Sequence, residues 1–291
     1  MKKTIRSASK HCETIALATG YWRPGENYEL QILKALEGKV QNGDVITISE
    51  KAISTAAGNI VDEKPIRSSM LARFLAGFWM SIVWACVLGT FCHLREKTVD
   101  RFRTYPVEEG SKHKQLALNE VGFLQALMHG SEGGIDGSNL PYSYVSLTLK
   151  DAQKIAEQMR EKIHSELGKN VVIVIVDTDK TYSYRSFHFT PRPKPIQGIQ
   201  SHGGVCAYLL GRFLRLKMRS TPIALSGASF SAETALRIAE AANKARGYGA
   251  GRNVWDMAET FGVELTEVTW EMLEEVEHKP IVIVRPRRKS R

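Results

Sequence analysis

Two segments of the sequence place carboxylates where they could bind a cation. Asp136 lies in GGIDGSN (133–139), a loop of glycines and small polar residues. The apolar run VVIVIV (171–176) is followed at once by Asp177 and Asp179. The run predicts a fully buried strand, and the acids are expected at its end, where solvent and substrate can enter. The pattern therefore indicates a site built from two distant parts of the chain.

Mg²⁺ and Mn²⁺ are the cations that such a site would favour. Both prefer oxygen ligands, and both usually keep waters and substrate phosphates in their coordination shells. Asp136 and Asp177 would share one ion if their segments meet, and Thr178 would add a hydroxyl or carbonyl oxygen. The nearby glycines would let a phosphate approach main-chain N–H groups, since no Cβ stands in the way. The alternative is structural, because Asp and Gly are also common turn residues.

The elements that must position these residues mix helices and strands irregularly. Apolar residues recur at three and four positions over 149–168, which predicts a helix, and a second helix is expected over 232–246. Besides the buried run, strands are expected at 45–49 and 280–284. No regular strand–helix–strand repeat is present, so the predicted fold class is α+β.

The segment 67–94 is predicted to be helical, and its central part, Phe74–Cys92, has no charged residue. That part is about as long as the shortest membrane spans, ~17–20 residues. A helix in the core and a helix at a dimer interface would show the same pattern. A buried or interfacial helix is preferred, because the segments on both sides contribute to one soluble site. The polar stretch 104–115 is expected to be an exposed connection.

Composition and charge limit the possible partners. The 291 residues carry a formal net charge of +9, which favours anionic molecules. Part of that charge lies in a predicted basic tail, 285–291, after a single domain at 1–284 that is formed of one unit or two intertwined subdomains. No nucleic-acid-binding module is recognised, and neither a dinucleotide-binding glycine motif nor a P-loop is present. The four cysteines lack metal-like spacing. They indicate a reducing cytoplasm. Neither nucleic acid nor membrane is expected as a partner, because no binding module is recognised and the apolar segment is expected to be buried or interfacial.

In series, the motifs resemble those of the coenzyme F420-0:L-glutamate ligases, also called gamma-glutamyl ligases. GGIDGSN (133–139) is similar to the family's A-G-I-D-x-S-N loop, and VIVIVDTD (172–179) is similar to its strand followed by D-T-N. Upstream, GDVITISEKAISTAAG (43–58) and ATGYWRPGEN (18–27) are similar to two further family segments. Order and approximate spacing agree from residue 14 to about residue 253.

This resemblance implies a mixed, largely antiparallel sheet with helices, and a homodimeric ligase that depends on GTP and Mg²⁺ or Mn²⁺. The nucleotide would phosphorylate a carboxylate of the acceptor, such as the deazaflavin coenzyme F420-0. The amine of L-glutamate would then attack the acyl phosphate. By motif, the implied metal ligands are Asp136, Asp177 and Thr178, and the implied nucleotide contacts are Asn139, Glu50, Lys51 and Thr55.

Several positions depart from the family pattern. Thr55 stands where the family has lysine, and Asp179 replaces the asparagine of D-T-N. Near the family's late acidic residue the chain has Arg246 and Arg252, which would bind a phosphate or carboxylate directly. These departures leave a second interpretation open. The chain would then be a non-catalytic paralogue that binds an anionic cofactor or nucleotide on the same scaffold.

Overall fold

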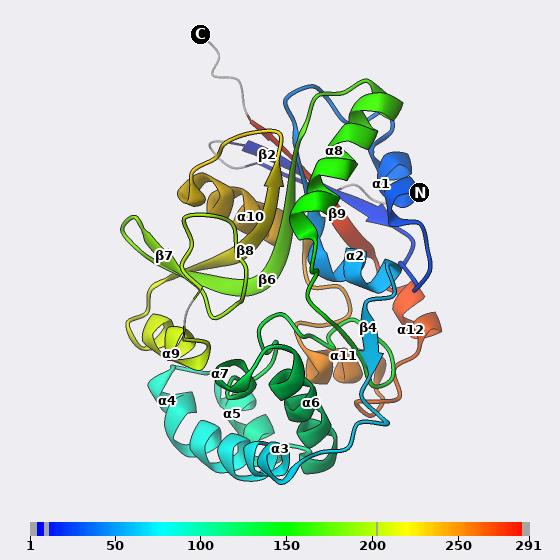
Figure 1. The fold of residues 1–291 in the computed structure, drawn as a ribbon. Helices are drawn as coiled ribbons and strands as arrows, with labels where there is room; N and C mark the ends of the chain where they lie inside the picture. Colours follow the sequence, from blue (N-terminus) through cyan, green and yellow to red (C-terminus); the bar gives the residue numbers. More distant parts are fainter. Residues whose placement is uncertain (1–4, 9–11, 202, 287–291) are drawn as a thin grey trace.

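A seven-stranded sheet forms the centre of the structure, a computed structural model that describes residues 5–8, 12–201 and 203–286 (Figure 1). In the described sheet only β3 and β6 run parallel, while the other pairs are antiparallel. The predicted α+β fold with a mixed, largely antiparallel sheet is therefore confirmed. The strand order is β1 (Ile5–Ala8), β2 (Cys12–Thr19), β9 (His278–Pro286), β3 (Val45–Ser49), β6 (Val172–Tyr184) and β7 (Phe187–Phe189), with β8 (Lys217–Ser226) paired to β6.

The alternation of isoleucine and valine in the central strands decides which face each helix covers. Neighbouring residues of a strand point to opposite faces, so Ile173 and Val174 lie in different cores. The isoleucines of β3, β6 and β9 pack against α1 (Tyr28–Leu36), α2 (Glu50–Ala56) and α8 (Ala152–Leu167). The valines pack against α10 (Ala232–Arg246). Each fully buried isoleucine contributes roughly 1.5–3 kcal/mol of transfer free energy, so this pattern fixes the register.

The two helices with the clearest apolar period form where the sequence predicts them. α10 has the predicted bounds, 232–246, and the Ser231 side chain caps it by accepting a hydrogen bond from the Thr234 N–H. α8 ends at Gly168, which has a φ of 62°. That left-handed conformation suits glycine at a helix C-terminus.

A layer of helices lies beyond one end of the sheet (Figure 1). A continuous helix over Met70–Phe91 confirms the prediction for 67–94, and most of it, Leu75–Leu88, is π-helical. By length and composition this helix could cross a membrane, although only a third of its most apolar stretch is buried. The layer comprises α3 (Met70–Phe74), the π-helix, α4 (Gly89–Phe91), α5 (Glu96–Arg103), α6 (Val107–Glu120), α7 (Phe123–Ala126) and α9 (Val205–Phe213).

The prediction of an exposed connection at 104–115 is wrong, because most of that stretch belongs to α6. Pro106 is the N-cap of α6, and Glu108 and Glu109 occupy its first turn, where carboxylates stabilise the partial positive charge of a helix N-terminus. Lys114 is fully buried, since Glu132 provides its counter-charge. A polar side chain paired inside the protein gives no apolar period in the sequence.

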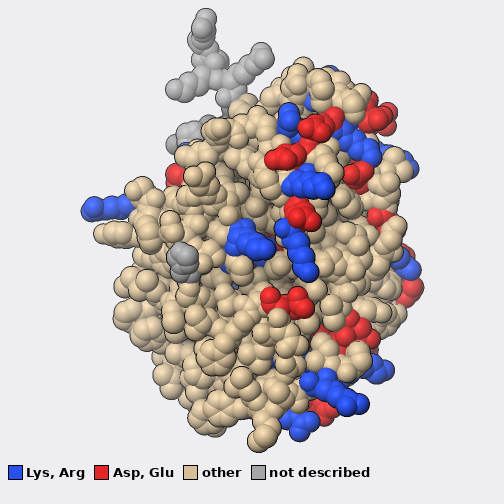
Figure 2. All heavy atoms as spheres, in the orientation of Figure 1, with Lys and Arg blue, Asp and Glu red and all other residues tan. Residues whose placement is uncertain are grey.

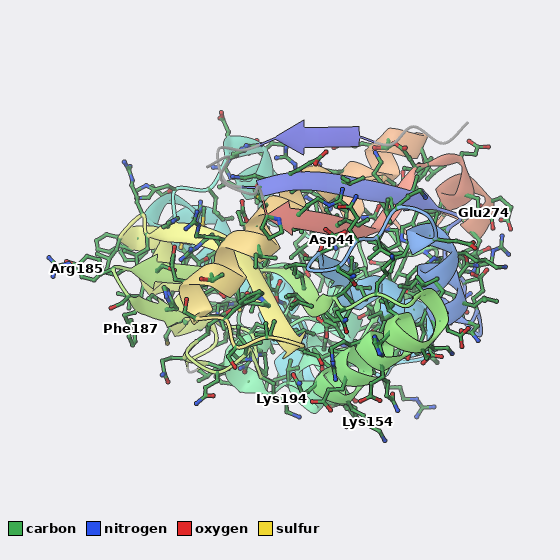
Figure 3. All side chains as sticks on the ribbon, turned by 90° about the horizontal axis from the view of Figure 1, so that it is seen from above. Asp44, Lys154, Arg185, Phe187, Lys194 and Glu274 are labelled. Carbon is green, nitrogen blue, oxygen red and sulfur yellow. The ribbon has the colours of Figure 1, made fainter. Side chains whose placement is uncertain are left out.

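The last strand extends into the predicted tail. β9 includes Arg285 and Pro286, while residues 287–291 lie outside the described residues. The Arg285 guanidinium makes two hydrogen bonds of 2.8 Å to the carboxylate of Asp44, which is labelled beside β9 in Figure 3. Two short helices, α11 (Val254–Phe261) and α12 (Trp270–Glu275), precede this strand, and β4 (Ile60–Asp62) and β5 (Tyr144–Ser146) form a separate small sheet.

Candidate functional site

A cavity of about 1180 Å³ is lined by residues of both the sheet and the helical layer. Asp136 and Asp177 both line it, so the two acidic segments meet at one cavity. Glu50 is not among its lining residues, in contrast to the nucleotide contact predicted for it. The other predicted site residues that line the cavity are Lys51, Thr55, Asn139, Thr178, Arg246 and Arg252.

The loop of Asp136 folds around its own carboxylate. Oδ1 accepts a hydrogen bond of 2.7 Å from the Ser138 N–H, and Oδ2 accepts one of 3.0 Å from the Ser138 hydroxyl. Lys51, which α2 carries to this loop directly after β3, pairs with Oδ2 and also donates to the Ser138 carbonyl at 2.8 Å. Lys51 therefore offsets the charge of Asp136 and fixes the loop against α2.

Asp177 and Asp179 lie inside β6 rather than at its end, so the predicted end of the strand is wrong. The pairing of β6 with β8 shifts between Asp177, opposite Thr221, and Lys180, opposite Ser220. The two extra residues form a bulge, which bends a strand and redirects its side chains. Asp177 Oδ2 and Asp179 Oδ2 are buried without a hydrogen-bond partner. Burial, reinforced by the neighbouring Asp177 charge, raises the pKa of Asp179 well above its usual range.

Arg192 is buried behind the two acidic segments and contacts both. One terminal nitrogen, Nη2, donates to both Glu50 oxygens at 2.6 Å, and the other, Nη1, donates to the Gly133 carbonyl at 3.2 Å. Its Nε lies 3.0 Å from Asp177 Oδ2 without the alignment of a hydrogen bond. A Cβ at Gly134 would lie 1.8 Å from Nη1, so only glycine fits there. Arg192 therefore links the Asp136 loop, through the Gly133 carbonyl, to the Asp177 bulge and to Glu50 of α2.

Asn139 binds the glycine-rich turn that follows α10. Its side-chain oxygen accepts the Ala250 N–H at 2.7 Å, and its side-chain nitrogen donates to the carbonyls of Tyr248 and Gly251. A Cβ at Gly249 would lie 2.5 Å from the Asn139 oxygen, which explains that glycine. The Asn139 amide therefore forms its hydrogen bonds with the backbone of this turn.

Two arginines reach the cavity from the same region. Arg246, at the end of α10, donates to Asn243 at 2.9 Å, and the described residues provide no carboxylate within ion-pair distance of it. Burial lowers the pKa of Arg246 to about 10, although Asp177 opposes that shift. The Arg252 guanidinium lies over the Tyr248 ring, 4.5 Å from its centroid. Both guanidinium groups therefore remain available to an anion in the cavity.

The helical layer adds an ionic network that the sequence did not predict. His113 lies between two carboxylates, 2.6 Å from Glu63 through Nδ1 and 2.6 Å from Glu132 through Nε2. Glu132 also accepts a bond of 2.5 Å from Lys114. Burial would lower the pKa of His113, but the charges of Glu63 and Glu132 raise it well above its usual range. This network attaches α6 to the segment that carries Asp136. In the sequence, only the position of Glu132, four residues before Asp136, pointed to it.

Replacing His113 by glutamine should cost most stability at acidic pH. A raised histidine pKa in the folded state adds stability below the unfolded pKa of ~6.5, and that stability is lost as pH rises through the folded value. His113→Gln lowers the unfolding free energy. We expect this loss to be larger at pH 6 than at pH 9, by at least ~1 kcal/mol. Urea unfolding at both pH values measures it, with exposed His164→Gln as the control. Equal losses at the two pH values would contradict the network.

The acidic segments fit a divalent cation in part. Among the described residues no group of three His, Cys, Asp or Glu side chains forms a ready metal site. Asp177 and Asp179 nevertheless each keep a buried carboxylate oxygen without a hydrogen-bond partner, and both residues line the cavity. Mg²⁺ and Mn²⁺ use few protein carboxylates and complete their shells with water and phosphate. The donor set therefore suits an ion that binds together with a phosphate-bearing molecule.

Comparison with known proteins agrees with the fold and the motifs. The family model for F420-0:Gamma-glutamyl ligase matches residues 16–199, which include both acidic segments, Lys51 and Arg192. The chain belongs to the F420-0:gamma-glutamyl ligase family. Arg246 and Arg252 lie beyond the matched residues.

Individual relatives divide into two kinds. The chain is 34% identical over 281 residues to the uncharacterized protein MJ1361 of Methanocaldococcus jannaschii, a match that covers 92% of this chain and 94% of the relative. Two proteins named coenzyme F420:L-glutamate ligase, from Methanopyrus kandleri and M. jannaschii, are 24% and 25% identical over 159 and 169 residues. Those matches cover 54% and 57% of this chain and only 55% and 59% of the ligases.

Proposed function

We propose that the chain is a metal- and nucleotide-dependent ligase that joins a carboxylate acceptor to an amino acid such as L-glutamate through a gamma-glutamyl-type amide bond. The acceptor is the deazaflavin coenzyme F420-0 or a related acid, and GTP is the co-substrate. The family membership supports the reaction class. The observation that carries the proposal is the shared cavity of Asp136 and Asp177, with the unpaired guanidinium of Arg246 in the same lining.

The arrangement suits phosphorylation of a carboxylate. A carboxylate is a poor electrophile, so a phosphate leaving group must be installed before an amine can form an amide. Arg246 and Arg252 would bind the phosphates by charge-assisted hydrogen bonds. Lys51 would exchange its contact with Asp136 for a phosphate oxygen as the nucleotide binds. Thr55, also on the wall, donates its hydroxyl to the Lys51 carbonyl at 2.8 Å and stabilises that turn of α2.

Asp136, Asp177 and Thr178 would hold Mg²⁺ or Mn²⁺, and their common position in the cavity wall supports that role. When bound, such an ion offsets the negative charge of the phosphates during transfer. Arg192 and Glu50 would keep Asp177 and the Gly133 carbonyl in place from behind. Asn139 would support the cavity wall through the glycine-rich turn rather than through its own amide. A cytoplasmic homodimer completes the proposal, and sedimentation velocity tests the dimer.

The purified protein should add glutamyl groups when incubated with F420-0, L-glutamate, GTP and Mn²⁺. Mass spectrometry of the acceptor measures the product, and reactions without GTP or with Asp177→Asn should show none. A product that forms equally well without GTP would contradict the proposed chemistry.

A second function is favoured by the internal pairing of the site. Asp136 already pairs with Lys51, and Asp177 with Arg192. Such a site could bind an anionic cofactor or nucleotide without transferring a phosphate, as a non-catalytic paralogue. Tight binding of GTP or F420-0 in calorimetry, with no glutamyl product in the same protein preparation, would select this alternative.

A further inference from the structure

The helix over Met70–Phe91 has no charged residue after Arg73, yet the protein covers only one of its faces. Leu75, Met80 and Trp84 point inward and are at most 1% exposed. They pack against other members of the helical layer, and the Trp84 indole N–H donates to the Leu127 carbonyl at 2.8 Å. A helix without a polar face is normally enclosed by protein or lipid.

The opposite face of this helix forms a continuous apolar surface with α9. Phe91 stacks on Phe213, with ring centroids 4.2 Å apart, which joins the two helices. In Figure 2 the part of the molecule over α4 and α9, at the lower left, shows no charged side chain. We call this surface the apolar face, and its members are between 41% and 59% exposed: Phe74, Phe78, Ile82, Val87, Phe91, Leu210, Phe213 and Leu214.

Basic residues border the apolar face. Arg73 and Arg215 are exposed, and each directly adjoins a member of the face in the sequence, Phe74 and Leu214 respectively. Neither arginine has an ion-pair partner among the described residues. The sequence between Asp179 and Glu233, which includes α9, contains no acidic residue. The residues that adjoin the face at Phe74 and along α9 are therefore basic rather than acidic.

The charge of this border distinguishes between the possible occupants. A second copy docked on the same face would bring two basic borders together, and like charges across an interface oppose association. A membrane-spanning helix would have to expose Trp84 and Met80 from the core. An anionic lipid surface matches both the apolar face and the basic border, since aromatic and aliphatic side chains enter the headgroup region while arginines bind lipid phosphates.

We propose that the protein docks peripherally on anionic membranes through the apolar face, with the helix over Met70–Phe91 lying in the plane of the interface. Contiguous exposed apolar surfaces with a polar rim mark sites of interaction with proteins or membranes. No member of the apolar face lines the cavity with Asp136 and Asp177, although Met80 of the same helix and Tyr208 of α9 do, so docking does not depend on the ligase proposal.

Vesicle co-sedimentation of the full chain tests the docking. The wild type should pellet with vesicles of phosphatidylcholine and phosphatidylglycerol, with at least ~10-fold weaker binding to phosphatidylcholine alone, because Arg73 and Arg215 contribute about 1 kcal/mol each near an anionic surface. Phe78→Asp should abolish pelleting. Leu30→Asp on α1 is the matched control, since Leu30 is 47% and Phe78 46% exposed, and it should bind like the wild type. Circular dichroism checks that both variants fold.

Arg73→Gln with Arg215→Gln gives a second test that leaves the apolar side chains unchanged. This double variant should lose the preference for phosphatidylglycerol while keeping its fold. Wild-type protein that stays in the supernatant with both vesicle types would overturn the proposal. So would a wild-type dimer in sedimentation equilibrium that Phe78→Asp dissociates, because the face would then bind a second copy.

Discussion

Asp136→Asn and Asp177→Asn should each reduce Mn²⁺-dependent GTP affinity by at least ~100-fold while the protein stays folded. The two carboxylates line one cavity from distant segments, and replacing a metal ligand costs more than the ~10–100-fold that loss of an outer partner costs. The amide keeps the size of the side chain, so packing changes little. Isothermal titration calorimetry with and without Mn²⁺ measures the effect.

Asp256→Asn provides the control for this experiment. Asp256 also lines the cavity but pairs with Arg101 at 2.9 Å, away from the acidic segments. Its variant should bind GTP within about threefold of the wild type, as expected when no ligand is lost. If the three variants bound GTP equally well, neither acidic segment would contribute to nucleotide binding.

Arg192→Met should lower the unfolding free energy by ~3–5 kcal/mol, because removal of one partner leaves buried carboxylates unpaired. The Arg192 side chain is 2% exposed and supplies the counter-charge of Glu50 and Asp177. Burial raises the pKa of Glu50 to about 7, so urea unfolding is best measured at pH 8, where its carboxyl is ionised.

The double variant Glu50→Gln with Arg192→Met separates charge from packing. It should be more stable than Arg192→Met alone, since Gln needs no counter-charge, and the coupling between the two sites should reach ~1–3 kcal/mol. Arg192→Lys keeps the charge, but one ammonium group cannot contact Glu50, Gly133 and Asp177 as the three guanidinium nitrogens do, and this variant should lie between the wild type and Arg192→Met. A loss below ~1 kcal/mol for Arg192→Met would contradict its role as a central counter-ion.

Local sequence patterns predicted the elements that bury an apolar face. The continuous apolar run of β6 and the three-and-four period of α8 depend only on nearby residues, and both elements form where expected. α6 was missed because its buried Lys114 depends on Glu132, which is 18 residues away. The end of β6 was misplaced because the bulge at Asp177 depends on pairing with Thr221.

The sequence predicted the location of the site better than it predicted the contacts that its residues make. The motifs identified Asp136 and Asp177, and both line the cavity. They gave no signal for Arg192, whose contacts with Glu50 and Gly133 span 142 and 59 positions of sequence. They also could not show that Asn139 is engaged by the turn after α10. Contacts between charged or amide groups that are far apart in the chain leave no periodic pattern in a single sequence.

The most direct test is a crystal structure of the protein soaked with Mn²⁺ and a non-hydrolysable GTP analogue, in which anomalous scattering locates the metal. The account predicts an anomalous peak in contact with carboxylate oxygens of both Asp136 and Asp177, beside the phosphates of the nucleotide. An ordered nucleotide in the cavity with the metal bound elsewhere, or with neither carboxylate in contact with it, would contradict the central claim.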